Sequence, residues 1–233
     1  MTWKIELKKT PEMLVIVPSR NRPESVAEIT QCLLDNSLDV DICFGLDDDD
    51  TSTYEHVPGV IYETNPRLMM NGTLNLIANK YADSYKFLCF MGDDHRPRVH
   101  GWDKILSEPL KVKPGFSYGN DLIQREFLPT AVVVSSEIVK SLGYMAPPIL
   151  KHLYLDNFWL DLGKAIDSIN YFDDVVIEHM HPLLEKSSVD NTYNESWVLV
   201  NHDKAMYEKY KESDFLNDVS KVMDIYENSN NWS

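Results

Sequence analysis

Short apolar runs alternate with helical patterns over the first part of the chain, and this alternation restricts the fold more than any other feature of the sequence. The runs at residues 13–17, 40–46 and 87–91 lack a helical period and predict buried strands, and a shorter strand is expected near residues 60–63. Apolar stripes with helical spacing follow Pro23 and cross residues 74–81. Because parallel strands need long crossover connections, the alternation predicts an α/β fold with a mostly parallel central sheet flanked by helices.

The pattern is less regular after Pro97. Helices are expected over residues 102–110, 136–142 and 156–166, and strands over residues 116–118, 131–134 and 175–181. Residues 203–226 form an amphipathic helical pattern. No internal repeat or change in composition divides the chain, so we expect a single domain over residues 1–233.

The charge balance is acidic, with 22 lysines and arginines, 37 aspartates and glutamates, and a formal net charge of −15. Such a charge repels phosphate backbones, so nucleic acid could bind only through a local basic patch. The start of the sequence lacks the apolar segment of a signal peptide, and no apolar run approaches the length of a membrane span. We therefore expect a cytoplasmic protein without a membrane partner.

Three predicted strands are followed by polar clusters, at residues 18–22, 47–50 and 92–96. In open parallel sheets, ligands bind beyond the carboxyl ends of the strands, so these clusters are expected to form one crevice. Clustered carboxylates repel one another unless a cation neutralises them, and Mn²⁺ or Mg²⁺ suits oxygen ligands. Neighbouring arginines can bind diphosphate oxygens. The alternative is that residues 47–50 and 92–94 form solvated turns.

The order of four segments, VIVPSRNRPE, LDDDD, RLMMNGTLNLIANKY and FLCFMGDDHRPR, resembles the nucleotide-sugar half of GT-A fold glycosyltransferases. The resemblance covers about residues 13–193 and is greatest to small family-2-like enzymes of the kind found in bacteriophages. It implies a Rossmann-like GT-A domain with a nucleotide-sugar-binding half over about 13–100, an acceptor and metal half over about 101–195, and a C-terminal amphipathic helix over 203–227. It also implies an enzyme, a metal-dependent transferase that moves a sugar from a nucleoside diphosphate such as UDP to an acceptor hydroxyl.

The resemblance and the charge pattern together assign roles to individual residues. Asp94 is expected to bind Mn²⁺ or Mg²⁺, with His181 completing the metal shell and His179 as the alternative histidine. The family motif has two aspartates separated by one residue, whereas position 92 is glycine here and the carboxylates are the adjacent Asp93 and Asp94. Adjacent side chains of an extended segment point to opposite sides, so only one of the pair is expected to bind the metal. The expected donor-binding residues are Pro18, Ser19, Arg20, Arg22, Asp47, Asp48, Asn71, Asp93 and Lys186.

Asp156 resembles the acceptor-side carboxylate that deprotonates the attacking hydroxyl in inverting GT-A enzymes. Such a base is chemically reasonable because the hydroxyl must lose its proton as the new bond forms. A retaining enzyme would need a different arrangement, and the structural alternative is that Asp156 only caps its helix.

Two other functions compete with glycosyl transfer. A nucleotidyltransferase also uses strand-end aspartates and metal, but it ordinarily has a glycine-rich phosphate loop where this chain has PSRNRPE. A non-catalytic module that binds sugar or metal would show no turnover. The acceptor remains open among hydroxymethylated pyrimidines of phage DNA, a virion protein and a glycan, and the sequence leaves the donor, the stereochemistry and the oligomeric state undetermined.

Overall fold

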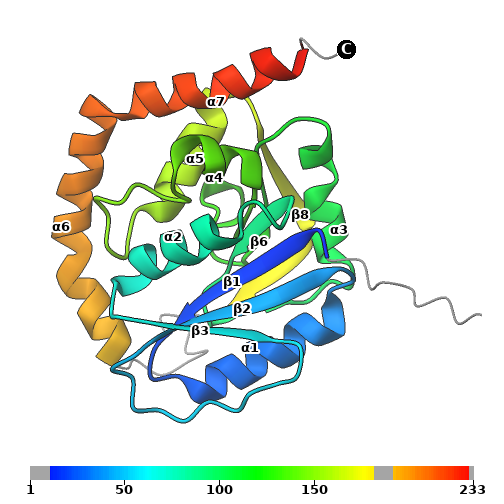
Figure 1. Cartoon of the computed structure of the whole chain (residues 1–233), viewed down its shortest axis with the longest axis vertical. Helices are drawn as coiled ribbons and strands as arrows, with labels where there is room; N and C mark the ends of the chain where they lie inside the picture. The colour runs from blue at the N-terminus through cyan, green and yellow to red at the C-terminus, as the bar shows by residue number, and fades with distance from the viewer. Residues whose placement is uncertain (1–10, 181–190, 231–233) are drawn as a thin grey trace, which may run out of the picture.

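The computed structural model describes residues 11–180 and 191–230, with side chains from 199 to 228 in the second range. Its eight strands form a sheet in the order β3-β2-β1-β4-β7-β6-β8-β5 (Figure 1). The strands are β1 (Met13–Ser19), β2 (Val40–Asp47), β3 (Ile61–Asn65), β4 (Phe87–Phe90), β5 (His95–Pro97), β6 (Phe116–Asn120), β7 (Val132–Ser135) and β8 (Ile169–His179).

Helices cover both faces of this sheet (Figure 1). They are α1 (Pro23–Asn36), α2 (Met69–Tyr81), α3 (Trp102–Ser107), α4 (Ser136–Leu142), α5 (Leu155–Ala165), α6 (Asn191–Ser213) and α7 (Phe215–Asn230), with short 3-10 turns η1 (Pro109–Lys111) and η2 (Arg125–Phe127). No helix in the described part of the chain is long and apolar enough to cross a membrane.

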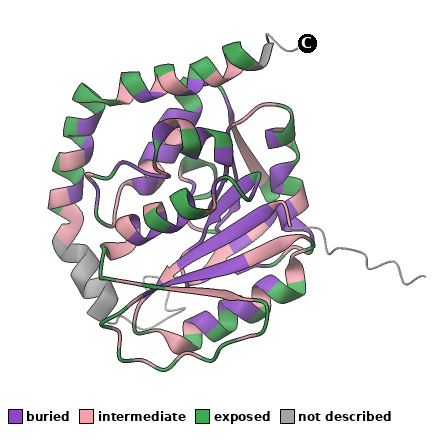
Figure 2. Cartoon of the chain, in the orientation of Figure 1, coloured by how far each residue is buried: buried purple, intermediate pink, exposed green. Residues whose placement is uncertain are grey.

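The side chains of each strand alternate between two cores, which explains why the strands read as continuous apolar runs. In β1, Leu14 and Ile16 belong to the core that α2, α4, α5 and α7 cover. Met13, Val15 and Val17 point the other way, toward α1 and α3. Figure 2 shows the resulting layer of buried residues along the central strands. A strand buried on both faces is typical of a sheet with helices on each side.

The sheet is mixed, and the parallel part is the part that the sequence predicted. β1 pairs in parallel with β2 and with β4, and β2 pairs in parallel with β3. β7 pairs antiparallel with both β4 and β6, which the expected mostly parallel arrangement did not include. The connection from β6 to β7 contains only the 3-10 turn η2. Without a crossover helix, two neighbouring strands run antiparallel.

Three elements differ from the sequence prediction. β5 has only three residues, His-Arg-Pro, and no apolar pattern that could have predicted it. β8 begins at Ile169 instead of residue 175, because its register with β6 shifts at Gly119/Asn120. α6 lies mostly before the predicted tail, and Asp214 separates it from α7. The two helices meet at a corner of the molecule and run along its outside (Figure 1).

Candidate active site

The polar clusters that follow β1, β2 and β4 meet at one edge of the sheet, as the sequence predicted. A cavity of about 380 Å³ lies there, and Ser19, Asp47 and Asp93 from the three clusters line it. The parallel pairing of β1 with its two neighbours is the cause, because it brings the carboxyl ends of these strands to the same edge.

One wall of the cavity consists of ion pairs between the β1 loop and the two other clusters, and we call it the donor wall: Ser19, Arg20, Arg22, Asp47 and Asp93. Nη1 of Arg20 lies 2.9 Å from Oδ2 of Asp47, and Nη1 of Arg22 lies 3.0 Å from Oδ1 of Asp93. The Ser19 hydroxyl donates to Oδ2 of Asp93 at 2.5 Å. Burial raises the pKa of Asp93 to about 6, although Arg22 acts in the opposite direction.

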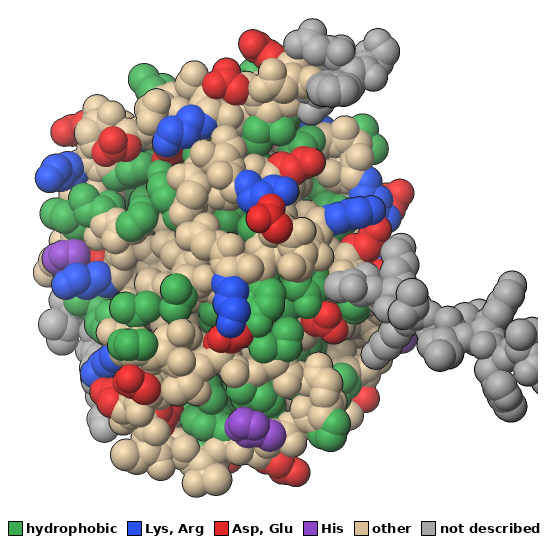
Figure 3. Space-filling model, in the orientation of Figure 1, with side chains coloured by type: hydrophobic (Ala, Val, Ile, Leu, Met, Phe, Trp, Pro, Cys, Tyr) green, Lys and Arg blue, Asp and Glu red, His purple; other side chains and the backbone are tan. Residues whose placement is uncertain are grey.

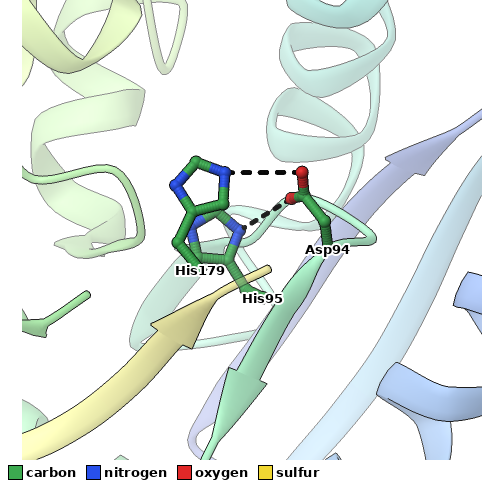
Figure 4. A group of neighbouring side chains, drawn as sticks. All are labelled: Asp94, His95 and His179. Carbon is green, nitrogen blue, oxygen red and sulfur yellow. Dashed lines mark ion pairs between the residues drawn. The ribbon is translucent and has the colours of Figure 1, made fainter. Parts of the chain in front are cut away.

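Another part of the cavity lining contains Asp94, His95 and His179, which we call the metal corner. One ligand atom from each of these residues lies within 4.8 Å of the others. Nε2 of His179 is 3.4 Å from Oδ2 of Asp94, and Nδ1 of His95 is 3.4 Å from Oδ1 of the same carboxylate (Figure 4). The two imidazole rings stack with their centroids 4.4 Å apart. A carboxylate and imidazole nitrogens are suitable ligands for a divalent metal.

Main-chain hydrogen bonds hold the metal corner in place. β5 and β8 pair antiparallel with His95 opposite His179, and the N–H of Met180 donates to the carbonyl of Asp94 at 2.8 Å. These contacts fix the backbones of all three residues. The positions of the side chains therefore follow from the pairing of two strands that lie far apart in the sequence.

His95 differs from the other two residues because its Nδ1 already has a donor. The N–H of Gly92 lies 3.0 Å from this nitrogen and donates to it. A Cβ at position 92 would lie 2.7 Å from Oδ1 of Asp94 and 3.0 Å from Nδ1 of His95, which is too close. A side chain at position 92 would therefore displace one of these two groups. With the lone pair of Nδ1 engaged, Asp94 and His179 are the better candidates for metal ligands.

The charges in the metal corner support one another. Burial alone would raise the pKa of Asp94, but the neighbouring imidazoles of His179 and His95 hold it well below its ordinary value. Burial would lower the pKa of His179, and the carboxylates of Asp94, Asp121 and Asp156 outweigh it and raise that pKa. Burial and the neighbouring His179 lower the pKa of His95, so its imidazole stays neutral.

Asp156 lies across the cavity, at the start of α5. The helix begins after Tyr154, whose backbone is left-handed at φ 67°, and no side chain caps this end. The N–H of Asn157 donates to Oδ1 of Asp156 at 2.9 Å, and Asp156 is not the N-cap, because Tyr154 occupies that position. Burial raises the pKa of Asp156 to about 6. A carboxylate with a pKa near neutrality is suited to accept a proton.

The structure distributes the sequence-predicted residues unequally. Asp48 is exposed and does not line the cavity. Asn71 is fully buried, and its side-chain amide donates to the carbonyls of Pro147 and Leu150, so this residue holds the loop before α5. His181 and Lys186 lie outside the described residues. The predicted residues that line the cavity are Pro18, Ser19, Arg20, Arg22, Asp47, Asp93, Asp94 and Asp156.

Sequence reasoning did not find several residues near the cavity. Thr130 and His152 line it, and Asp121 lies beside His179. None of them belongs to a motif that sequence patterns identify. Arg96 belongs to the polar cluster after β4 but is buried, and it donates to the carbonyls of Asp93 and His95 and to Glu28. It therefore stabilises the backbone of residues 93–95 and does not line the cavity.

Comparison with known proteins gives a match in structure only. No protein-family model matches the chain, and no curated protein matches it. In fold, it is similar to 232 chains of solved structures. One is S. aureus TarS 1-349 in complex with UDP, which is 12% identical with a TM-score of 0.56, over 71% of this chain and 59% of that one.

Two further structures are similar over more of their own length. The mannosyltransferase PcManGT from Pyrobaculum calidifontis, in complex with GDP-Man and Mn²⁺, is 10% identical with a TM-score of 0.52, over 93% of this chain and 74% of that one. Glucosyl-3-phosphoglycerate synthase from Mycobacterium tuberculosis, in complex with Mn²⁺, UDP and phosphoglyceric acid, is 16% identical with a TM-score of 0.53, over 75% and 73%.

At these identities the similarity concerns the fold alone. This chain spans about 59% of the length of TarS 1-349, so the activity of a whole neighbour cannot be transferred to it. The helices on both faces of the sheet and the similarity to these structures agree with the fold predicted from the sequence. The chain has the α/β GT-A fold of glycosyltransferases.

Proposed function

We propose that this protein is a metal-dependent glycosyltransferase that moves a sugar from a nucleoside diphosphate to an acceptor hydroxyl. The observation that carries the proposal is the convergence of Asp94 and His179 at 3.4 Å in a cavity that also contains the arginines of the donor wall and Asp156. Diphosphate, metal and general base are the three needs of this reaction, and the cavity offers side chains for each.

The residues of the metal corner fit Mn²⁺ or Mg²⁺. Asp94 and His179 supply two ligands, and these metals commonly take the rest of their shell from substrate phosphates and water. When bound, the metal would stabilise the charge of the departing diphosphate as a Lewis acid. His181, which the sequence favoured as the histidine ligand, lies outside the described residues, and the contact between His179 and Asp94 favours His179.

The donor wall supplies the groups for the nucleotide. Arg20 pairs with Asp47 and Asp49, and Arg22 pairs with Asp93. A guanidinium can exchange such a carboxylate for the oxygens of a diphosphate. We assign Asp93 to the ribose or donor sugar, because its carboxylate contacts Ser19 and Arg22 within the donor wall. Pro18 and Asp47 complete this side of the cavity, as they line it too.

Asp156 would accept the proton of the acceptor hydroxyl if the reaction inverts configuration. It lines the cavity from α5, on a different element from both the donor wall and the metal corner, as a base acting on the acceptor should. Its pKa of about 6 leaves it ionised at neutral pH and still basic enough to take a proton.

Only the charge of the protein restricts the choice among the possible acceptors. Over the face in Figure 3, lysines and arginines are interspersed with aspartates and glutamates, and the described part of that face carries no broad basic patch. With a net charge of −15, we place a protein or glycan acceptor ahead of phage DNA containing hydroxymethylpyrimidines.

The test is hydrolysis and binding of a panel of UDP- and GDP-sugars with Mn²⁺, without acceptor, for the native protein and for Asp94→Asn. We expect slow turnover of one donor that depends on Mn²⁺ and is lost in Asp94→Asn. Asp173→Asn is the matched control, because Asp173 is an exposed residue of β8 that does not line the cavity. Binding without turnover would favour a non-catalytic module, and transfer of the nucleotide to a phosphate would favour a nucleotidyltransferase.

A further inference from the structure

Asp121 is a buried aspartate next to the metal corner that no part of the proposed reaction uses. Its side chain follows β6, and only 3% of the residue is exposed. Oδ2 lies 4.0 Å from Nδ1 of His179, on the side of the ring opposite the contact between Nε2 and Asp94. The His179 imidazole therefore stands between two carboxylates, with one at each nitrogen.

Backbone donors fix the orientation of the Asp121 carboxylate. Oδ1 accepts the N–H groups of Ile123, Gln124 and Arg125, at 2.9, 2.7 and 2.9 Å. The carbonyl of Asp121 accepts the N–H of His179 at 3.2 Å, which ties the two backbones together. Because Oδ1 has three donors, Oδ2 is the oxygen left to face His179.

The hydroxyl of Thr130 makes the direction of this network unambiguous. It donates its one proton to Oδ2 of Asp121 at 2.8 Å, so its oxygen can only accept from Nε2 of His95, which lies 3.4 Å away. His95 then carries its proton on Nε2, in agreement with the N–H of Gly92 that donates to Nδ1. Each donor in this hydrogen-bond network has an acceptor, and Oδ2 of Asp121 acts only as an acceptor.

We propose that Asp121 is a positioning residue that keeps a proton on Nδ1 of His179, so that Nε2 presents its lone pair to a divalent metal beside Asp94. The inference rests on the metal site of the proposed function. An ionised carboxylate can only accept, and it therefore selects the tautomer with the proton on the facing nitrogen. Histidine ligands of metals commonly donate their second N–H to a carboxylate, which fixes the ring and increases its basicity.

Asp121→Asn tests this role with little change in shape. The amide oxygen can still accept the three backbone N–H groups, which places the amide nitrogen where Oδ2 was. That nitrogen directs its N–H groups toward Nδ1 of His179, which favours a lone pair on Nδ1 and the proton on Nε2, the atom that should bind the metal. We expect Mn²⁺ affinity, measured by electron paramagnetic resonance with UDP or GDP present, to fall about 10- to 100-fold.

Asp103→Asn is the matched control. Asp103 is also buried, at 1% exposure, and accepts the backbone N–H groups of Leu38 and Asp39, but it does not line the cavity. This variant should keep native Mn²⁺ affinity. Nitrogen NMR of His179 with Mg²⁺ supplies a readout that a purely structural role would not change: we expect the proton on Nδ1 in the native protein and on Nε2 in Asp121→Asn.

The outcomes separate this inference from the proposed function. If the native protein binds no Mn²⁺, the metal site itself is wrong and the role of Asp121 falls with it. If the native protein binds Mn²⁺ and Asp121→Asn binds it equally with an unchanged tautomer, only the positioning role is overturned.

Should Asp121→Asn fail to fold, Thr130→Val removes the hydroxyl that holds Oδ2, and Thr130→Ser retains it. Weaker Mn²⁺ binding by Val and native binding by Ser would support the inference, and equal binding by both would overturn it.

Discussion

The donor wall and the metal corner of the cavity are both charged, but they are held in place by different contacts. In the donor wall, side chains pair with side chains, as in Arg20 with Asp47 and Arg22 with Asp93. In the metal corner, main-chain hydrogen bonds between β5, β8 and the residues around them fix the backbone, and the side chains follow from it.

This difference matters for how each region can bind. Side-chain ion pairs can exchange one anion for another, so a diphosphate could replace a carboxylate on an arginine with little backbone movement. The metal corner has less freedom, because moving His179 means breaking strand pairing. A metal site benefits from that rigidity, since ligand atoms must lie at closely defined distances. The two regions should therefore respond independently to substitution, and the predictions for Arg22 and Gly92 test this.

Asp156→Asn should have the largest effect, although Asp156 belongs to neither region. Loss of a general base lowers the rate of transfer by about 100- to 10,000-fold. Because neither region changes, donor and Mn²⁺ affinities should stay native, as titrations of both would show. The same substitution removes a carboxylate that burial destabilises, so the thermal midpoint should rise by about 2–4 °C.

Asp161→Asn is the control for Asp156→Asn on the same helix. Asp161 accepts from Tyr207 and Lys211 and does not line the cavity, so its replacement should leave the transfer rate unchanged. Full activity in Asp156→Asn would show that the reaction does not use this base, and a retaining mechanism would then be favoured.

Arg22→Gln tests the donor wall. It removes a charged donor to the diphosphate and leaves Asp93 with the Ser19 hydroxyl, so we expect the KM for the donor to rise about 10- to 100-fold. Mn²⁺ affinity should be nearly native, which is the opposite of the result expected for the metal corner. Arg98→Gln is the control, because Arg98 is an exposed arginine that pairs with Glu178 away from the cavity. A large loss of Mn²⁺ binding in Arg22→Gln would contradict the independence of the two regions.

Activity and stability should respond to acid in opposite directions. Asp156 works as a base only when ionised, so kcat at saturating Mn²⁺ should fall about tenfold per pH unit below pH 6. Burial raises the pKa of Asp93 and Asp156 to about 6. Their contribution to the free energy of unfolding is therefore present at low pH, where both are protonated, and is lost as the pH rises through 6. These two carboxyls should therefore favour a higher thermal midpoint at pH 5 than at pH 7, whereas the lowered pKa of His95 acts in the opposite direction. Asp156→Asn should shift this pH dependence by removing one of the two contributions, and an identical dependence in both proteins would contradict the shift assigned to Asp156.

The donor side could be predicted from the sequence because its determinants are local. Each apolar run ends directly in its polar cluster, and parallel pairing places those ends together without further information. The place of Ser19, Asp47 and Asp93 in the cavity could therefore be predicted from the sequence alone. The antiparallel strand β7 is a different matter, because nothing in the run Val132–Ser135 indicates its direction.

The metal corner could be predicted only in part, because its geometry depends on contacts between distant segments. β5 has three residues and is recognisable only through its partner β8. Asp121 sits between strands, in a segment without a motif, and its relation to His179 arises from the shift in register between β6 and β8. A sequence pattern carries no information on such a register, so it could not predict which residue faces the second nitrogen of His179.

Gly92→Ala is the smallest and sharpest test of the metal corner. The added Cβ would lie 2.7 Å from Oδ1 of Asp94 and 3.0 Å from Nδ1 of His95, so one of these side chains must move by several tenths of an ångström. If strand pairing makes the corner rigid, Asp94 moves away from His179 and Mn²⁺ affinity falls, by less than about tenfold because both ligands remain. Donor nucleotide binding without metal should not change, since the donor wall does not contact position 92 through its side chain. Native Mn²⁺ affinity in Gly92→Ala would mean that Asp94 rotates freely within the corner, and the contrast between a fixed metal corner and an exchangeable donor wall would then have to be given up.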